Sequence, residues 1–229
     1  IDILNDDGTL SEAATLYVGK DRFEVRKKIA IDLETKDVNL LKMGSGSVRG
    51  DGVITGIAVA VKDWSGYYPI AHAGGGNMDR KKVLEWFRTV LKTDATKIFH
   101  NAMYDVCWIR KESGLMPQGP LLDTMVAASV IDENRMKYSL DSLGKDYLDD
   151  FKYKWDLQQK TLTWSKGNIK DPMTNMHKLP YELVKDYAEQ DVNLTLRLWR
   201  HFEKKLDQEE KVDNGKVKTL RSIFNLETL

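Results

Sequence analysis

Short apolar runs mark the first part of the sequence after a polar start. Residues 28–35 (KIAIDLET) are apolar and rich in β-formers until they end in acids, and residues 52–61 (GVITGIAVAV) form a second run. Apolar runs of this length, bounded by turn residues, are typical of buried strands. We therefore predict strands at these two places, with shorter strands at residues 67–71 and 97–99.

Helical spacing of apolar residues prevails further along the chain. Asp79 has a side chain suited to a helix N-cap, and apolar residues recur every three or four positions from there to residue 92. Comparable patterns predict five more helices, at residues 101–112, 121–132, 139–148, 180–207 and 216–229. Residues 151–179 are predicted to be irregular. Strands first and helices afterwards predict an α/β fold, a mixed sheet flanked by helices.

The 229 residues suffice for one α/β domain with peripheral additions. Residues 1–27 are polar and weakly patterned, so we expect a peripheral N-terminal segment. The charged break QEEKVDNG separates the main domain, residues 28–207, from a linker and last helix at residues 208–229. Because the chain starts with Ile and ends in an apolar stretch, we expect a piece of a longer polypeptide.

The composition excludes several classes of site. Its 35 Lys and Arg balance its 35 Asp and Glu, so any affinity for nucleic acid must come from a local patch. The single cysteine, Cys107, excludes an intramolecular disulfide and a cysteine-based zinc site. The sequence has neither an apolar run long enough for a membrane span nor a signal-peptide core. We expect a soluble, intracellular protein without a membrane partner.

Asp32 and Glu34 end the first predicted strand. Since side chains alternate between the faces of a strand, residues i and i+2 point to the same side. Acids also end strands at solvent-exposed edges, and a single pair taken alone favours that interpretation. The apolar residues directly before Asp32 indicate, however, that these acids emerge from a buried strand.

Two further acids lie on predicted helices. Asp105 follows Asn101 by four residues, so both share one helical face, where Asn101 suits either an N-cap or a substrate contact. Asp105 could complement the helix dipole, but its apolar neighbours make an unpaired acid costly there. Asp191 follows Tyr187 at the same spacing, at the border of an apolar stripe, with a solvated acid as the alternative.

Together these carboxylates form the ligand set that hard cations require. Mg²⁺ and Mn²⁺ take oxygen ligands and keep positions for water and substrate phosphate. Two such ions activate a water and stabilise the leaving oxygen in phosphodiester hydrolysis. Tyr187, one turn before Asp191, offers a hydroxyl that could orient the attacking water. The residues therefore favour metal-dependent phosphodiester chemistry.

The order of the motifs resembles that of a known superfamily. IDLET (31–35), HNAMYD (100–105) and YAEQD (187–191) resemble the three motifs of the DEDD exonucleases, in their tyrosine-bearing branch. LLDTMVAASVIDEN and YSLDSLGKDYL are similar to proofreading domains of family A, polymerase-I-like DNA polymerases. This resemblance covers residues 28–205 and implies a ribonuclease-H-like fold with a five-stranded mixed sheet. The final TLRSIFNLETL resembles the helix that leads into the polymerase domain.

Carried over position by position, the resemblance implies a catalytic set of five residues: Asp32, Glu34, Asp105, Tyr187 and Asp191. Asp32, Glu34 and Asp191 would ligate a first Mg²⁺ or Mn²⁺ ion, and Asp32 would also reach a second. Asp105 would hold that second ion, and Tyr187 would position the attacking water. Thr35 and Asn101 would touch the terminal nucleotide, and Tyr104 would pack against its sugar or base. Apart from the resemblance, His100 is the one histidine near the proposed site, and we expect it to touch the substrate.

The segment at residues 151–179 combines positive charge with aromatic rings. It carries six Lys against two Asp, with Trp155 and Trp164 among them. Lysines between aromatic rings suit a single strand, because phosphates meet the charges and bases stack on the rings. The alternative is a solvated loop whose tryptophans cover the core.

The implied function is 3′→5′ hydrolysis of single-stranded or frayed DNA ends by two metal ions, as proofreading for a polymerase domain in the same parent chain. An RNA-trimming enzyme of the ribonuclease D type is the alternative from the same superfamily. A module that grips DNA ends or a partner protein without cutting is the alternative from another class. Intact acids at all four metal positions argue against that last interpretation.

Overall fold

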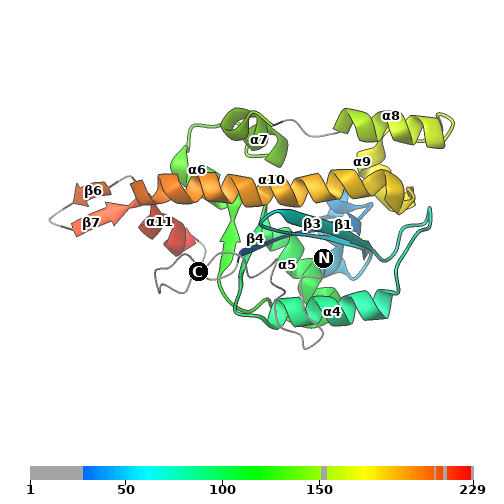
Figure 1. The fold of residues 1–229 in the computed structure, drawn as a ribbon, viewed down its shortest axis with the longest axis horizontal. Helices are drawn as coiled ribbons and strands as arrows, with labels where there is room; N and C mark the ends of the chain where they lie inside the picture. The colour runs from blue at the N-terminus through cyan, green and yellow to red at the C-terminus, as the bar shows by residue number, and fades with distance from the viewer. Residues whose placement is uncertain (1–27, 151–153, 209, 214–215, 228–229) are drawn as a thin grey trace.

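A five-stranded mixed sheet forms the centre of the computed structural model, which describes residues 28–150, 154–208, 210–213 and 216–227 (Figure 1). The predicted peripheral segment, residues 1–27, lies outside the described residues. In chain order the strands are β1 (Lys28–Lys36), β2 (Val53–Val61), β3 (Trp64–Pro69), β4 (Thr96–Phe99) and β5 (Leu121–Asp123). Their order across the sheet is β3-β2-β1-β4-β5. The first three strands pair antiparallel, whereas β1, β4 and β5 run parallel, so the predicted mixed sheet is confirmed.

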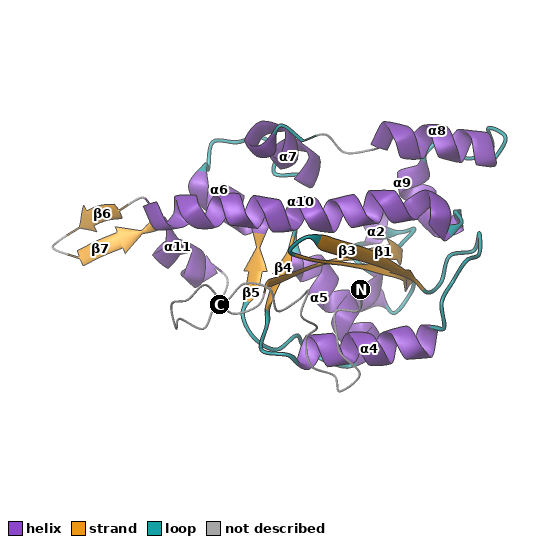
Figure 2. Ribbon diagram, viewed as in Figure 1, coloured by secondary structure: helices purple, strands orange, loops and turns teal. Residues whose placement is uncertain are grey.

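Helices cover both faces of this sheet (Figures 1 and 2). One face carries α4 (Arg80–Lys92) and α5 (Ala102–Ser113). The other carries α6 (Thr124–Ile131), α7 (Leu140–Leu148) and the long α10 (Tyr181–Gln208), which crosses β1, β2 and β3. Asp79 caps α4 as predicted, because its carboxylate accepts a hydrogen bond from the Lys82 amide at 3.0 Å.

The alternation of side chains along β1 assigns each residue to one face. Ile29, Ile31 and Leu33 pack into the cluster formed with α4 and α5, whereas Ala30 packs into the cluster formed with α10. Since even-numbered residues of β1 share the face of Ala30, this alternation aims Asp32 and Glu34 towards α10. The core therefore consists of two layers, and the acids belong to the α10 layer.

Three predictions about local structure were wrong. Residues 151–179 are mainly helical where they are described, with α8 (Lys154–Trp164), α9 (Pro172–Asn175) and the 3₁₀ turn η1 (Met176–Lys178). The segment read as one helix from residue 121 begins with β5, because its first residues pair in parallel with β4. The last helix is shorter than predicted, since a hairpin of β6 (Glu210–Asp213) and β7 (Lys216–Thr219) precedes α11 (Leu220–Glu227).

Two short helices, α2 (Leu40–Met43) and α3 (Gly46–Arg49), form in the Gly/Ser-rich loop after β1. Asp37 supports this loop, because its carboxylate accepts hydrogen bonds from the Gly46 amide at 2.8 Å and from Arg49 at 3.0 Å. Throughout the described ranges, no helix combines the length and the apolar character that crossing a membrane requires.

Replacing Phe87 tests the packing of the core layer between the sheet and α4. This side chain of α4 is fully buried, so Phe87→Ala should lower the free energy of unfolding by about 3–5 kcal/mol through lost burial and a cavity. Urea denaturation measures the loss. Glu85→Ala, on the exposed face of the same helix, should change stability by less than ~0.5 kcal/mol. Equal effects of the two substitutions would contradict the assigned faces.

Candidate metal-binding active site

Asp32 and Glu34 lie on the central strand β1, and the residues opposite them on the neighbouring strand β2 are small. Asp32 pairs across the sheet with Ala58, and Glu34 pairs with Gly56. Directly opposed residues of an antiparallel pair project to the same face, so the positions beside both carboxylates carry either a methyl group or no side chain. On the face towards α10, the β2 residues opposite these acids therefore contribute no large side chain.

Asp105 reaches the same strand from the adjacent helix α5. Its carboxylate accepts a hydrogen bond from the Leu33 amide at 3.2 Å. That amide is available because β4 pairs with β1 only along residues 28–30, and the chain then turns into α5. With 3% of its surface exposed, Asp105 is a buried acid held at the end of the β1–β4 pair.

Tyr187 and Asp191 point towards this region from α10. Both side chains are buried, and they lie one helical turn apart on the side of α10 that faces the sheet. Asp32 and Glu34 face the same helix from below. The structure therefore brings the predicted catalytic set to one region between the end of β1, the start of α5 and the first half of α10 (Figure 1).

The acids of this region change the pKa values of their neighbours. Burial raises the pKa of Asp105 well above its ordinary value, and the negative charge of Asp32 raises it further. Burial likewise raises the pKa of the Tyr187 hydroxyl, with added shifts from the charges of Asp191 and Glu34. Each of the four acids thus lies within electrostatic reach of another member of the set. Tyr187 remains a neutral hydroxyl at neutral pH.

This donor set fits a divalent cation. Buried carboxylates whose neighbours are also carboxylates are costly as anions, and a cation among them removes that cost. Oxygen-only donors match Mg²⁺ and Mn²⁺. Across the described residues, no three His, Cys, Asp or Glu side chains already surround a single point in the manner of metal ligands. Like-charge repulsion opposes such close gathering unless a cation sits among the acids.

Thr35 and Tyr104, both predicted to contact the terminal nucleotide, are brought together at the end of β1. Their hydroxyls are hydrogen-bonded at 2.7 Å. The Tyr104 hydroxyl also donates to Asp37 at 3.4 Å, and its ring packs edge-on against Trp108. A fixed aromatic ring and a hydroxyl therefore border the acids on the α5 side.

Asn101 and His100 lie at the turn between β4 and α5. Asn101 occupies the N-cap position of α5 with φ 69°, but its side chain makes no capping hydrogen bond and is exposed. The prediction that Asn101 is the N-cap residue is confirmed by its position, although its side chain does not cap the helix, and a substrate contact stays a prediction. His100 is hydrogen-bonded to the Thr124 hydroxyl at 2.9 Å, which orients its ring along the start of α6.

Asp123 is a residue of this region that sequence reasoning missed. Its carboxylate accepts hydrogen bonds from the amides of Asn101 at 3.1 Å and Ala102 at 2.7 Å, and it also caps α6. One side chain thus ties the turn before Asp105 to the end of β5. The sequence pattern placed Asp123 inside the helix predicted at residues 121–132, so it gave no signal of this role.

Trp155 and Trp164 lie on α8, which packs against α10. Their rings are 72% and 46% exposed, so the interpretation that they cover the core is wrong. The positive charge around them is partly neutralised, because Lys160 pairs with Asp156 and Asp186. Their contact with a nucleic-acid strand stays a prediction.

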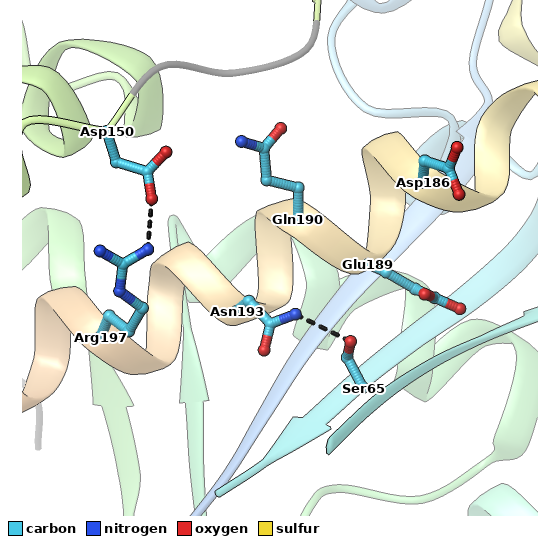
Figure 3. A pocket seen from close by; sticks show the side chains of 7 residues that line it. All are labelled: Ser65, Asp150, Asp186, Glu189, Gln190, Asn193 and Arg197. Carbon is cyan, nitrogen blue, oxygen red and sulfur yellow. Dashed lines mark hydrogen bonds and ion pairs between the residues drawn. The ribbon is translucent and has the colours of Figure 1, made fainter. Parts of the chain in front are cut away.

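An open pocket of about 510 Å³ lies beside α10, and none of the predicted catalytic residues lines it (Figure 3). It is lined by Ser65, Asp150, Asp186, Glu189, Gln190, Asn193 and Arg197. Two of its α10 residues, Asp186 and Gln190, directly precede Tyr187 and Asp191, so these two side chains are rotated by about 100° around the helix from the candidate site. An ion pair of Asp150 with Arg197 and a hydrogen bond from Asn193 to Ser65 cross it.

Asp105→Asn tests whether the buried charge is a liability in the absence of a cation. The amide oxygen can still accept from Leu33, while the charge that burial and Asp32 oppose is removed. We expect the variant to melt about 2–4 °C above wild type in EDTA at pH 7, the shift that ~1 kcal/mol gives in a domain of this size. Excess Mg²⁺ should stabilise the wild type more than the variant.

Thermal melts followed by circular dichroism provide this measurement, with Asp186→Asn on the exposed side of α10 as the matched control. A lower melting temperature for Asp105→Asn in EDTA would show that the carboxylate is a net stabilising group without metal.

Comparisons with known proteins agree with this geometry. Residues 9–207 match a family described as 3′-5′ exonuclease. A DNA-directed DNA polymerase of Pseudomonas phage M6 is 30% identical over 90% of this chain and 30% of its own length. DNA polymerase I of Borreliella burgdorferi is 30% identical over 82% of this chain and 18% of its own length. The chain thus spans less than a third of each relative.

A solved structure shares the fold. Trypanosoma brucei RNase D in complex with RNA U12 superposes with a TM-score of 0.58 at 16% identity, over 89% of this chain and 62% of that one. Identity this low shows the ribonuclease-H-like fold alone. The family match covers all three acidic motifs and most of the sheet and helices around them. The chain therefore belongs to the 3′-5′ exonuclease family of DNA polymerase I-like proteins.

Proposed function

We propose that this chain hydrolyses the terminal phosphodiester of DNA 3′ ends with two Mg²⁺ or Mn²⁺ ions, as the proofreading part of a DNA polymerase. The observation that carries this proposal is the shared placement of Asp32 and Glu34 on the α10 face of β1, next to Asp105 and beneath Tyr187 and Asp191. A binding module without catalysis has no need for four acids that oppose one another's charge.

Asp32, Glu34 and Asp191 would hold one ion, and Asp105, together with Asp32, would hold the other. When bound, such ions lower the pKa of an attacking water and neutralise charge on the phosphate and the leaving oxygen. The carboxylates supply the negative charge that keeps divalent ions in place. Asp105 and Asp191 are buried and Asp32 and Glu34 are half-buried, which lowers the local dielectric constant and strengthens each electrostatic contact.

Tyr187 would orient the attacking water rather than remove its proton. Its hydroxyl is buried beside Asp191 and Glu34, which raises its pKa and keeps it neutral. A neutral phenol can donate one hydrogen bond and accept others, so it fixes the direction of a water without becoming a base. The attacking water would thereby face the phosphate in line with the leaving oxygen.

The terminal nucleotide would lie across the end of β1. Thr35 and Tyr104 border the acids there, and their hydrogen bond fixes the tyrosine ring as a packing surface for a sugar or base. The exposed Asn101 side chain offers an amide at the neighbouring turn. His100 borders the same turn, and the exposed rings of Trp155 and Trp164 would stack on bases further along the strand.

The polymerase setting rests on the relatives. Both are DNA polymerases, and each is much longer than the segment that this chain matches. We propose that residues 28–207 form the exonuclease domain and that residues 208–229 lead towards a polymerase domain in the parent protein, inside the cell.

Loss of single acids tests the catalytic assignment. Asp32→Ala and Asp191→Ala should each reduce hydrolysis of a 5′-labelled single strand in Mg²⁺ by at least ~100-fold, because a metal site contributes several kcal/mol of charge stabilisation. Circular dichroism should report a retained fold. Asp186→Ala, one residue from Tyr187 on the exposed side of α10, should leave the rate within about twofold. Full-length product from wild type with either metal would refute the enzyme proposal.

Matched oligomers distinguish the two substrates. We expect a DNA strand to be shortened from its 3′ end at least ~10-fold faster than an RNA strand of equal length and sequence. The fold shared with RNase D supports the RNA-trimming alternative. Products resolved on a denaturing gel give the rates, and a strong preference for RNA would reverse our choice. Release of long internal fragments would contradict an exonuclease of either kind.

A further inference from the structure

A buried polar pair lies on the same face of the sheet as the acids but belongs to neither of the proposed residue sets. The Tyr67 hydroxyl and the His72 Nε2 atom are 2.5 Å apart. Tyr67 is a residue of β3 and is 7% exposed, and His72 follows β3 and is 3% exposed. Polar side chains this deeply buried are usually hydrogen-bonded to at least one partner, and here each residue is the partner of the other.

The register of the sheet places this tyrosine in the row of the acids. Asp32 pairs with Ala58, and Ala58 pairs with Tyr67, so all three project towards α10. A Cβ atom added to Gly56 would lie 2.0 Å from the Tyr67 hydroxyl oxygen. The hydroxyl therefore occupies the space that a side chain at position 56 would fill.

Gly56 is also the cross-strand partner of Glu34. The Cβ positions of two opposed residues in an antiparallel pair are about 4.5–5.5 Å apart. The Tyr67 hydroxyl, 2.0 Å from the Cβ position of Gly56, therefore lies close enough to the Glu34 side chain for the charge of Glu34 to act on it. The same proximity explains why the charges of Glu34 and Asp32 add to burial in raising the pKa of Tyr67, which keeps its proton available for donation.

His72 is fixed by its surroundings. Its backbone is clamped by Asn77, whose side chain accepts from the His72 amide at 2.7 Å and donates to the His72 carbonyl at 2.8 Å. The next residue, Ala73, donates from its amide to the His177 carbonyl at 2.8 Å. Burial lowers the pKa of His72, so the ring is neutral and carries one N–H. It forms a rigid support behind the tyrosine hydroxyl.

We propose that Tyr67 is a positioning residue for the metal site and that His72 carries its proton on Nε2. The Tyr67 hydroxyl then accepts a hydrogen bond from this N–H group, donates one to the Glu34 carboxylate and orients that carboxylate towards the cation. This inference rests on the proposed function of Glu34 as a metal ligand. Outer partners that orient ligating carboxylates change metal affinity or activity by about 10- to 100-fold when they are lost. Gly56 is required for the arrangement, because any Cβ there would displace the hydroxyl.

Mn²⁺ titration by calorimetry, together with single-strand hydrolysis, tests this role in the full chain. We expect Tyr67→Phe to weaken Mn²⁺ binding and to lower kcat by about 10- to 100-fold, with KM for the strand within twofold of wild type. His72→Leu should act in the same direction. His72→Gln should restore part of the loss, because its amide can place an N–H group near the Nε2 position.

Tyr68→Phe is the matched control. Tyr68 is the next residue of the same strand, on the opposite face, where its ring packs against Trp86 at 4.2 Å between centroids. It should bind Mn²⁺ as wild type does. In a Glu34→Ala background, Tyr67→Phe should change Mn²⁺ affinity no further, since a partner that acts only through Glu34 has nothing left to orient.

The outcomes separate the two proposals. Mn²⁺ affinity of Tyr67→Phe within twofold of wild type, or an undiminished effect in the Glu34→Ala background, would overturn the positioning role. If wild type binds Mn²⁺ but leaves the strand intact, the proposed function fails while the comparison of Mn²⁺ affinities still decides the role of Tyr67. Should Tyr67→Phe fail to fold, equal Mn²⁺ binding by His72→Leu and His72→Gln would overturn the role instead.

Discussion

Gathering like charges in a largely buried region is the constraint on which the rest of this structure depends. Asp32 and Glu34 emerge from the central strand beneath a long helix that carries another acid, Asp191. Such an arrangement opposes folding unless space, hydrogen-bond donors or cations compensate for it. The small residues Ala58 and Gly56 leave room beside the strand acids, and the Tyr67 hydroxyl fills the part over Gly56. A site of this composition is explained by the cations that it would bind, rather than by its contribution to the stability of the fold.

The topology of the sheet positions the other side chains of the site through a small number of hydrogen bonds. Because β4 is short and parallel to β1, its pairing stops early, and α5 begins where the Leu33 amide still needs an acceptor. The Asp105 carboxylate accepts this hydrogen bond, which places Asp105 next to Asp32 and Glu34. Asp123 holds the turn before α5, while Thr124 holds the ring of His100. Chain direction, strand length and capping together position an acid from the opposite layer of the core.

Much of this arrangement followed from the sequence, and the parts that did not have physical reasons. The central strands were predictable because their apolar runs are bounded by turn residues, and the acids were predictable from their spacing on strands and helices. Strand β5 was missed because its three residues merge with the helix pattern after them. Helix α8 was missed because it buries little beyond Leu157 and Thr161. Tyr67 and His72 gave no signal, because their link to Glu34 depends on cross-strand register.

The central claim is that the four acids bind divalent cations at one place. Crystals of the chain soaked in Mn²⁺ provide the most direct measurement, since anomalous scattering locates the ion without reference to activity. We predict a peak bounded by Asp32, Glu34 and Asp191, with a second towards Asp105 when a 3′ end is bound. Mn²⁺ peaks confined to other acids, such as those beside Asp186, with the four carboxylates making no contact to metal, would contradict this account.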